Sequence, residues 1–308
     1  MTSIKTLSQH IQNMITIHLM GGLGNQLFQI FAVLAYSLEY GHPYIFPYSE
    51  TLTTGIERPT YWETLFQSIK SFTTITSASG FTNQMLTALP QWREPGFTYT
   101  KIPYIPLEQD FTLHGYYQSP KYFEAYKTPI LKLLKFPDIQ HTIRNQFAHY
   151  LDPSTHTISM HFRLGDYKYK QQHYPIMPPD YYRRALTHIL SNLSNTQTIR
   201  VLYFCEAEDN IYVTSVIDYL RESVGQSIDQ SVDWAKADDT IHDWQQLMLM
   251  SCCDSHIIAN SSFSWWGAYL CNSNNPFVCY PSTWFGPAMA NTHRVDDLFP
   301  ETWTKIQA

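Results

Sequence analysis

Strand-like and helix-like segments alternate regularly from residue 153 to the C-terminal end of this 308-residue sequence. Short apolar runs predict strands at 157–163, 199–205, 255–259 and 276–280. Apolar residues at helical spacing predict helices from about 180, over 209–224 and 240–253, and after 263. Strands that alternate with helices form a parallel sheet, since a parallel connection has to cross over the sheet. The second half of the chain is therefore predicted to be a doubly wound α/β domain.

The N-terminal part of the chain begins with a similar unit. Residues 15–20 predict a strand, 21–24 a tight glycine turn, 23–40 a helix that ends at Gly41, and 43–47 a second strand. Further on, 111–117 predict a strand, Ser119 and Pro120 begin a helix, and another helix runs over 137–151. The stretch 50–110 is rich in Thr, Ser, Pro and aromatic residues and predicts no element.

The segment Asp152-Pro153-Ser154 is the best candidate for a linker between domains. It divides the chain into 1–152 and 153–308, which we expect to be two Rossmann-like domains that face each other across a cleft. Ligands of such sheets bind at the carboxyl ends of the strands. The loops that follow residues 20, 117, 163, 205 and 260 are therefore the expected ligand-binding loops.

The composition limits the class of protein and its partners. Charged residues make up 15% of the sequence and aromatic residues another 15%, whereas a disordered chain has many charges and few rings. A net charge of −6 argues against nucleic acid or an anionic membrane as the main partner. The five cysteines, two of them the adjacent Cys252 and Cys253, have neither disulfide-framework nor zinc-knuckle spacing. No signal peptide and no run of 18 apolar residues is visible, so we expect no membrane span and a cytoplasmic location.

The segment from His161 to Tyr167 combines the most functional groups, and it lies where a predicted strand ends. The guanidinium of Arg163 can donate two N–H groups to phosphate oxygens. Gly165 lets the backbone approach a ligand, and Asp166 can orient the arginine, bind a sugar hydroxyl or act as a base. The same residues also fit a structural Arg–Asp ion pair beside a turn glycine.

Two other junctions of a strand with a helix carry groups suited to an anion or a sugar. The segment Asn260-Ser261-Ser262-Phe263-Ser264 offers hydroxyls, N–H groups and an aromatic ring at a helix start. An ordinary serine cap before buried tryptophans fits it as well. The turn that contains Gly22, Gly24, Asn25 and Gln26 also exposes N–H groups. It lacks the third glycine of a dinucleotide fingerprint, because Leu27 stands there, so a plain tight turn and a ligand loop both fit.

Two further segments are less specific. Glu206 and Asp209 follow a predicted strand and can contact a base or a ribose, or simply complement the dipole of the next helix. Gln118 lies in the segment Gly115–Phe123, which by itself is typical of a capped helix start with core aromatic residues.

Taken together, four of these segments resemble the α-1,2-fucosyltransferases of glycosyltransferase family 11. Members carry, in this order, a GGLGNQLFQ segment, a GYFQSxKYF-like segment, an HxRxGDY motif and an ANSSFSWWGA motif. This sequence has them at Gly21–Gln29, Gly115–Phe123, His161–Tyr167 and Asn260–Ala268. The resemblance implies a GT-B-like α/β fold whose C-terminal domain holds GDP.

The resemblance also implies an activity and a set of site residues. Such enzymes transfer L-fucose from GDP-β-L-fucose to the 2-hydroxyl of a galactoside or similar sugar and invert the anomeric carbon, so GDP-fucose and a glycan acceptor are the expected partners. Arg163 would bind the diphosphate and stabilise the leaving GDP. The implied substrate-binding residues are Gly22, Gly24, Asn25, Gln26, Gln118, Glu206, Asp209, Asn260, Ser261, Ser262, Phe263 and Ser264.

Three points complete the expected site. No flanked Asp-x-Asp motif is present, so neither a metal nor a cofactor is expected. Leu164 stands where many family members have a second arginine, so one cationic contact is missing. The general base stays open: Asp166 is favoured because it is acidic and close to the phosphate-binding arginine, while His161 and His18 have a more suitable ordinary pKa.

Other functions stay open at this point. An NAD-dependent oxidoreductase would use the glycine turn, but the missing third glycine opposes it. A glycan-binding protein that kept the fold without catalysis would explain the aromatic surplus. A fucosyltransferase of a different linkage is the third alternative.

Overall fold

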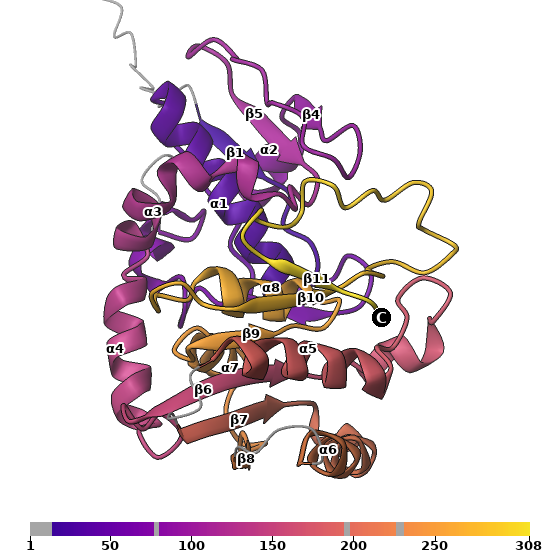
Figure 1. Cartoon of the computed structure of the whole chain (residues 1–308). Coiled ribbons are helices and arrows are strands. Elements are labelled where there is room, and N and C mark those ends of the chain that lie inside the picture. The colour runs from indigo at the N-terminus through magenta and orange to yellow at the C-terminus, as the bar shows by residue number, and fades with distance from the viewer. Residues whose placement is uncertain (1–13, 77–79, 194–197, 226–230) are drawn as a thin grey trace, which may run out of the picture. The chain divides into compact units, whose positions relative to one another are not determined.

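The structure, a computed structural model, describes residues 14–76, 80–193, 198–225 and 231–308 (Figure 1). Its internal contacts group the chain into two compact units, Met1–Leu134 and Lys135–Ala308. The boundary placed by the sequence after residue 152 lies beyond helix α4 (Phe136–Gln146), which belongs to the second unit. Each unit is built around a parallel sheet, which confirms the predicted α/β class. The cleft expected between two domains stays a prediction.

The first unit has three parallel strands in the order β1 (Ile15–Ile17), β5 (Phe111–His114) and β4 (Gln91–Arg93). Helix α1 (Leu23–Tyr40) follows β1 over the predicted range. It ends at Gly41, whose φ of 78° lies in the left-handed region that glycine adopts without strain. The helix is buried along most of its length, so its packing against the sheet stabilises the unit.

The second strand predicted at 43–47 is wrong. Only two isolated bridges form there, from Ile15 to Tyr44 and from Phe46 to Thr73. Pro43 and Pro47 bracket this segment and have no amide hydrogen to donate to a neighbouring strand. The pairing is therefore too short to count as a strand.

Short elements make up the rest of the first unit. They are β2 (Thr51–Leu52), β3 (Arg58–Pro59), the 3-10 helix η1 (Gln67–Phe72), α2 (Asn83–Thr87), the 3-10 turns η2 (Pro120–Tyr122) and η3 (Glu124–Tyr126), and α3 (Lys127–Leu133). None is long enough to produce a clear period, which explains why 50–110 predicted no element. Ser119 caps η2 by accepting a hydrogen bond from the Lys121 amide at 3.3 Å, but a continuous helix does not begin until α3.

The second unit contains a parallel sheet in the order β11-β10-β9-β6-β7-β8. Its strands are β6 (Thr155–His161), β7 (Thr198–Phe204), β8 (Val232–Lys236), β9 (Ser255–Ile257), β10 (Val278–Pro281) and β11 (Thr304–Ile306). Counted from β6 as the first strand of this unit, the order is 6-5-4-1-2-3, which is that of a dinucleotide-binding Rossmann domain. The chain reverses its direction across the sheet between β6 and β9, and a crevice for ligands is expected at this point.

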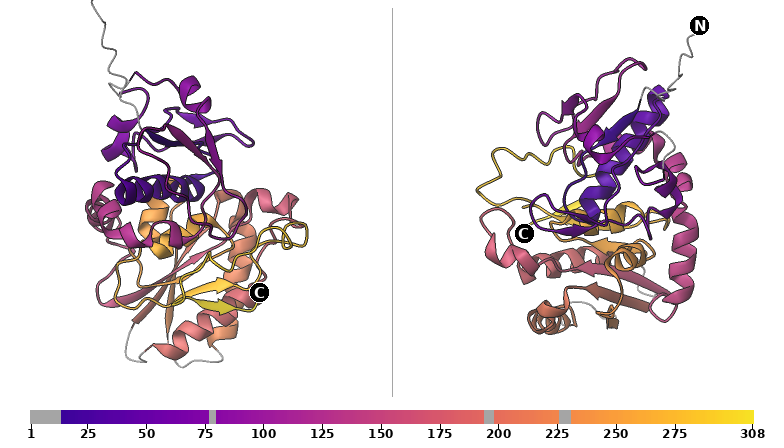
Figure 2. Two further views of the ribbon diagram at one scale, coloured as in Figure 1. Left: turned by 90° about the horizontal axis from the view of Figure 1, so that it is seen from above. Right: turned by 180° about the vertical axis from the view of Figure 1, so that it is seen from behind.

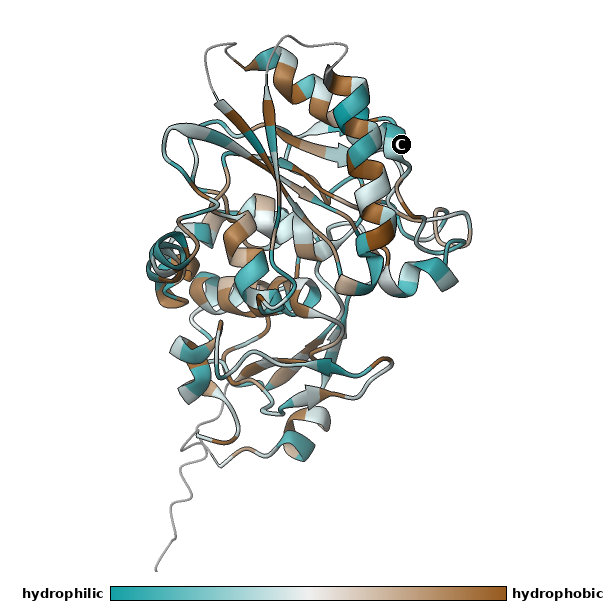
Figure 3. Cartoon of the chain, turned by 90° about the horizontal axis from the view of Figure 1, so that it is seen from below, coloured by the Kyte–Doolittle hydropathy of each residue, from teal (hydrophilic) through white to brown (hydrophobic). Residues whose placement is uncertain are grey.

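Helices cover both faces of the six-stranded sheet (Figures 1 and 2). Right-handed crossovers place α5 (Pro179–Asn192) and α6 (Asn210–Gly225) on one face. They place α7 (Asp243–Met250) and α8 (Ser262–Tyr269) on the other, where α7 also packs against α4. Figure 3 shows that the central strands are largely apolar while the helices carry both apolar and polar residues, as expected for a sheet buried on both sides. No helix in the described part of the chain is long and apolar enough to cross a membrane.

Candidate active site

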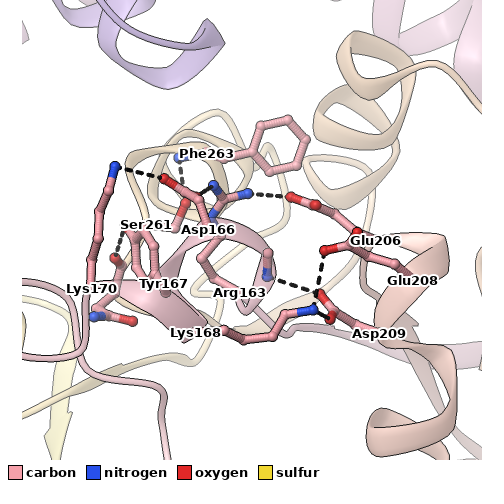
Figure 4. A network of polar contacts seen from close by, with 12 residues as sticks. Arg163, Asp166, Tyr167, Lys168, Lys170, Glu206, Glu208, Asp209, Ser261 and Phe263 are labelled. Atoms are coloured by element: carbon pink, nitrogen blue, oxygen red, sulfur yellow. Dashed lines mark hydrogen bonds and ion pairs between the residues drawn. The ribbon is translucent and has the colours of Figure 1, made fainter. Parts of the chain in front are cut away.

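Three loops meet at the carboxyl edge of the six-stranded sheet. Because β6 lies between β9 and β7, the loops that follow these three strands leave the sheet side by side. They carry Arg163, Ser261 and Glu206, respectively, and Figure 4 shows these side chains close together. The loops after β6 and β9 stand on either side of the point where the strand order reverses. The sheet topology therefore brings together the residues predicted from the HxRxGDY and ANSSFSWWGA motifs.

Arg163 is held by two carboxylates. Its Nη1 donates to Glu206 and its Nη2 to Asp166, and its guanidinium lies 5.0 Å from the centre of the Tyr167 ring. The arginine side chain is 20% exposed, while the side chains of Glu206 and Asp166 are 51% and 30% exposed. Both carboxylates thus lie on the more open side of the arginine.

The backbone conformation and the close neighbours of residue 165 require a glycine at this position. Its φ of +39° lies in the left-handed region, and a Cβ built on it would lie 2.9 Å from the carboxylate oxygens of Glu206. Its amide donates to the buried carboxylate of Asp209 at 3.0 Å. A side chain at this position would push Glu206 away from Arg163.

Asp209, which is predicted to contact guanosine, supports the Arg163 loop in this structure. It is 3% exposed, and besides the Gly165 amide it binds Lys168 Nζ at 2.6 Å. The ammonium also lies 3.1 Å from Glu208, and the bonds to Asp209 and then Glu208 raise the pKa of Lys168. Sequence reasoning missed this role of Lys168. The only signal for it is the run of acidic residues after β7, since the sequence does not give the pairing of β6 with β7.

Three acidic residues after β7 lie close enough together to be metal ligands. One oxygen each from Glu206, Glu208 and Asp209 lies within 4.8 Å of the others. Lys168 already binds two of the three carboxylates and Arg163 the third. The cations of the protein thus neutralise the cluster, and the expectation of metal-independent chemistry stays a prediction.

His161 is buried at the end of β6. It is 8% exposed, its ring lies 5.5 Å from the ring of Phe263, and its Nδ1 is buried without a hydrogen-bond partner in the described part of the chain. Burial, followed by the charge of Arg163, lowers the pKa of His161 to about 3. A ring with this pKa is a poor base near neutral pH. The geometry favours a packing role for His161 beneath Phe263.

Within the loop 260–264, three of the predicted ligand residues, Asn260, Ser261 and Ser264, form hydrogen bonds within the protein. Asn260 is buried, and its Nδ2 donates to the carbonyl groups of Pro175 at 3.0 Å and Trp284 at 3.1 Å. The Ser261 hydroxyl caps α8 by accepting from the Phe263 amide at 3.3 Å, and the buried Ser264 hydroxyl donates to the Ser261 carbonyl at 3.4 Å. Ser262 and Phe263 are only half-buried. Their position at the start of α8 makes them the better candidates for ligand contact.

The side-chain amides that are predicted to bind substrate in the first unit also form hydrogen bonds within the protein. Gln26 is buried and donates from Nε2 to the carbonyl groups of Gly21 at 3.0 Å and Pro59 at 2.9 Å. Gln118 Nε2 donates to Asn25 Oδ1 at 2.8 Å. These bonds join the glycine turn to other loops of the first unit. In contrast, a Cβ built on Gly22 would meet no atom within 4 Å, so the turn has open space at this residue.

The strand order defines the second unit as a Rossmann-type α/β domain, with Arg163 and the capped helix α8 beside the point where the order reverses. The model of glycosyl transferase family 11 matches residues 1–307, and the chain belongs to this family. The resemblance based on four motifs is thus confirmed.

Two curated relatives and one solved structure give the context. The O-antigen biosynthesis glycosyltransferase WbnK of Escherichia coli is 25% identical over 185 residues, which are 58% of this chain and 56% of WbnK. An alpha-1,2-colitosyltransferase of Escherichia coli is 28% identical over 183 residues, 51% of this chain and 50% of the relative. The chain spans about half the length of these curated relatives. An Arabidopsis thaliana FUT1 mutant in complex with GDP matches 88% of this chain and 71% of its own, with a TM-score of 0.46 and 10% identity.

Proposed function

We propose that this family 11 glycosyltransferase transfers L-fucose from GDP-β-L-fucose to the 2-hydroxyl of a galactoside or similar sugar, with inversion at the anomeric carbon. The observation that carries the proposal is the position of Arg163. It lies at the reversal point of a dinucleotide-type sheet and is held there by the exposed Glu206 and the half-buried Asp166, which an anion would replace.

In the proposed reaction, the diphosphate of the donor displaces Glu206 and Asp166 from the guanidinium of Arg163. The fork of the guanidinium then donates two hydrogen bonds to phosphate oxygens. The bond from the anomeric carbon to the diphosphate breaks as the acceptor oxygen attacks from the opposite side. Negative charge grows on the leaving GDP, and Arg163 together with the N-terminus of α8 stabilises this charge more than that of the bound donor.

Lys170 is our candidate for the missing second cation. Leu164, at the position of the second arginine of many relatives, is buried in the core of the second unit, so a cation there would be turned away from the crevice. Lys170 Nζ lies 3.6 Å from Asp166, whose carboxylate also binds Arg163, and the Lys170 side chain is 44% exposed. Displacement of Asp166 by a diphosphate would leave both cations available to it.

The names of the two curated relatives support the proposed acceptor and linkage. One relative acts in O-antigen biosynthesis, which supports a glycan acceptor, and the other is named for an α-1,2 linkage. The second name also makes colitose an alternative to fucose as the transferred sugar. GDP-colitose is therefore the most informative alternative donor.

The test is an acceptor screen with the purified chain, GDP-fucose and a panel of galactosides, with the linkage of the product determined by NMR. We expect an α-1,2-fucoside, with the same yield in the presence of EDTA. Transfer from GDP-colitose but not from GDP-fucose would show that colitose is the transferred sugar. A product with a linkage other than α-1,2 would contradict the proposed linkage. Binding of GDP without release of GDP from either donor would favour a glycan-binding protein, and binding of NADH would favour the oxidoreductase.

A further inference from the structure

The guanidinium of Arg163 has one contact that a bound diphosphate would leave in place. It is bound to Glu206 and Asp166, and it lies over the ring of Tyr167 at 5.0 Å from the ring centre (Figure 4). In the proposed function, the diphosphate takes the place of both carboxylates. The ring does not compete with phosphate for the N–H groups, because it attracts the cation through its π-electrons. Of these three contacts, only that with Tyr167 can therefore direct Arg163 when the donor is bound.

Tyr167 is the first of three aromatic rings that lie in contact. Its ring is stacked on that of Tyr174, with the centres 4.9 Å apart and the planes 23° apart. The ring of Phe285 follows, with its centre 6.0 Å from that of Tyr174. All three side chains are half-buried. We refer to Tyr167, Tyr174 and Phe285 as the aromatic row.

The aromatic row joins two loops of the second unit. Tyr167 lies in the 3-10 turn η4 (Gly165–Tyr169), Tyr174 in the loop between η4 and α5, and Phe285 in the loop between β10 and β11. In the sheet, β10 is separated from β6 by β9. The row thus connects the Arg163 loop with a part of the same unit that is distant in the sequence.

The backbone of the loop between β10 and β11 fixes the position of Tyr174. The amide of Gly286 donates to the His173 carbonyl at 2.8 Å, and that of Ala288 donates to the Gln172 carbonyl at 2.9 Å. A Cβ built on Gly286 would lie 2.4 Å from the carbonyl oxygen of Gln172, so the two backbones are in direct contact. Tyr174 is therefore anchored by main-chain bonds on either side of Phe285's neighbour, and it can serve as a firm support for Tyr167.

Stacking on Tyr174 controls a property of the Tyr167 ring that its hydroxyl does not. The bond from the hydroxyl to the Asn260 carbonyl fixes the tip of the ring. The ring can still rotate about its long axis, and a stacked neighbour opposes this rotation. Because the cation lies over the face of the ring, the plane of Tyr167 determines where the guanidinium can rest.

We propose that Tyr174 is a positioning residue for transfer, which holds the Tyr167 ring and through it the guanidinium of Arg163 in the direction that the diphosphate requires. The inference rests on the proposed function. In the free chain Glu206 and Asp166 also hold Arg163, so the stacked ring contributes little to its position. Once the donor has replaced both carboxylates, the direction of the two N–H donors depends on the aromatic row.

The first experiment compares fucosyl transfer by the wild type, Tyr174→Leu, Tyr174→Phe and the control Tyr169→Leu. Tyr169 is a tyrosine of η4 that is 86% exposed. We expect Tyr174→Leu to lower kcat by roughly 10-fold to 100-fold, the cost of a slightly displaced catalytic group. Tyr174→Phe keeps the ring and should retain the activity of the wild type, as should Tyr169→Leu. Wild-type kcat in Tyr174→Leu, or an equal loss in Tyr174→Phe, would overturn the role of the stacked ring.

The second experiment separates positioning from simple packing by a double-mutant cycle with Arg163→Ala. If Tyr174 acts through Arg163, Tyr174→Leu should lower kcat in the wild-type background and have no further effect once the guanidinium is absent. A ring that only packs the loop would lower kcat by the same factor in both backgrounds. If Tyr174→Leu does not fold, Phe285→Leu, which removes the ring one step further from Arg163, takes its place in the cycle.

Calorimetric titration with GDP distinguishes failure of this inference from failure of the proposed function. A wild type that transfers fucose beside a fully active Tyr174→Leu overturns the positioning role alone. If the wild type transfers no fucose, the proposed function fails, and the same cycle is measured by the affinity for GDP. Tyr174→Leu should then weaken GDP binding only where Arg163 is present. Equal losses in both backgrounds, or no binding of GDP by the wild type, would refute the positioning role as well.

Discussion

The hydroxyl of Tyr167 donates a hydrogen bond to the carbonyl oxygen of Asn260 at 3.2 Å. This bond joins the loop after β6 to the loop after β9, on either side of the reversal point of the sheet. Tyr167 also lies under the guanidinium of Arg163 at 5.0 Å, so one side chain supports the arginine and links it to the start of α8. Burial raises the pKa of Tyr167 to about 12, so the hydroxyl keeps its proton at all ordinary pH values.

Replacement of Tyr167 by Phe separates these two contacts. The ring remains beneath Arg163 while the bond to Asn260 is lost. We expect a loss of about 1 kcal/mol in the free energy of unfolding and a modest loss of GDP affinity. Urea unfolding and calorimetric titration with GDP measure both effects. A larger loss of affinity in Tyr167→Ala would assign the remainder to the cation–π contact, and equal losses in the two variants would argue against that contact.

Gly165→Ala tests the close approach of the Arg163 loop to Glu206. The φ of +39° and the 2.9 Å separation from the Glu206 oxygens predict a loss of about 1–3 kcal/mol in stability. Gly96→Ala is the matched control, because a Cβ there meets no atom within 4 Å and its φ is not in the left-handed region. Thermal unfolding of the two variants should therefore differ clearly. Equal melting temperatures would mean that the loop relaxes freely.

The sequence predicts the parts of this fold that local patterns control. Helix α1 agrees with the expected range because its apolar spacing and Gly41 both act locally. Strand β8 is missed because it is an edge strand that carries Asp233 and Lys236, and so it reads as a polar loop.

The candidate site, like the fold, is predicted from the sequence only where local patterns control it. Arg163 and the start of α8 are found because their motifs lie directly after strands. The clamp of Lys168 on Asp209 depends on the pairing of β6 with β7, which the sequence does not give. An amide such as that of Asn260 also looks the same in sequence whether it binds a ligand or a neighbouring carbonyl group. Motifs thus locate the site, whereas the roles of individual polar residues need the tertiary structure.

His256 makes the stability of the second unit depend on pH. Its Nδ1 lies 2.7 Å from the Ser159 hydroxyl, and both side chains are buried in the sheet. Burial, followed by His156, lowers the pKa of His256 to about 3, while in the unfolded chain the ring takes up a proton near pH 6.5. The unfolded state therefore binds the proton first as the pH falls. The stability that the neutral ring contributes is present above about pH 6.5 and is lost as the pH falls toward 3.

The measurement is urea unfolding between pH 8 and pH 5 for the wild type and His256→Gln. Each pH unit below 6.5 should cost the wild type about 1.4 kcal/mol more than the variant, since one proton per molecule is involved. Parallel curves for the two proteins would show that His256 is already charged in the native state. His256→Gln also loses packing contacts. This loss lowers the free energy of unfolding of the variant at every pH and leaves the difference in slope unchanged.

Arg163 is the residue on which the proposed function depends most. Arg163→Ala removes the group that binds the diphosphate and leaves Glu206 and Asp166 without their cation. We expect transfer to fall by about 100-fold or more, because the lost contact strengthens as charge grows on the leaving group. Arg163→Lys keeps the charge but not the fork of two donors, so it should recover only part of the activity. The exposed Arg221 on α6, which pairs with Asp218, provides the matched control Arg221→Ala.

Separate measurements of kcat and of GDP binding distinguish a role for Arg163 in the reaction from a structural role. A contact that is stronger in the transition state lowers kcat more than it weakens the binding of GDP, whereas a collapsed loop lowers both and also the melting temperature. In Glu206→Gln, Arg163 loses a competitor for the diphosphate, so GDP should bind at least as tightly as to the wild type. Wild-type turnover in Arg163→Ala would refute diphosphate binding by this residue. Weaker GDP binding in Glu206→Gln would instead assign Glu206 a direct contact with the nucleotide.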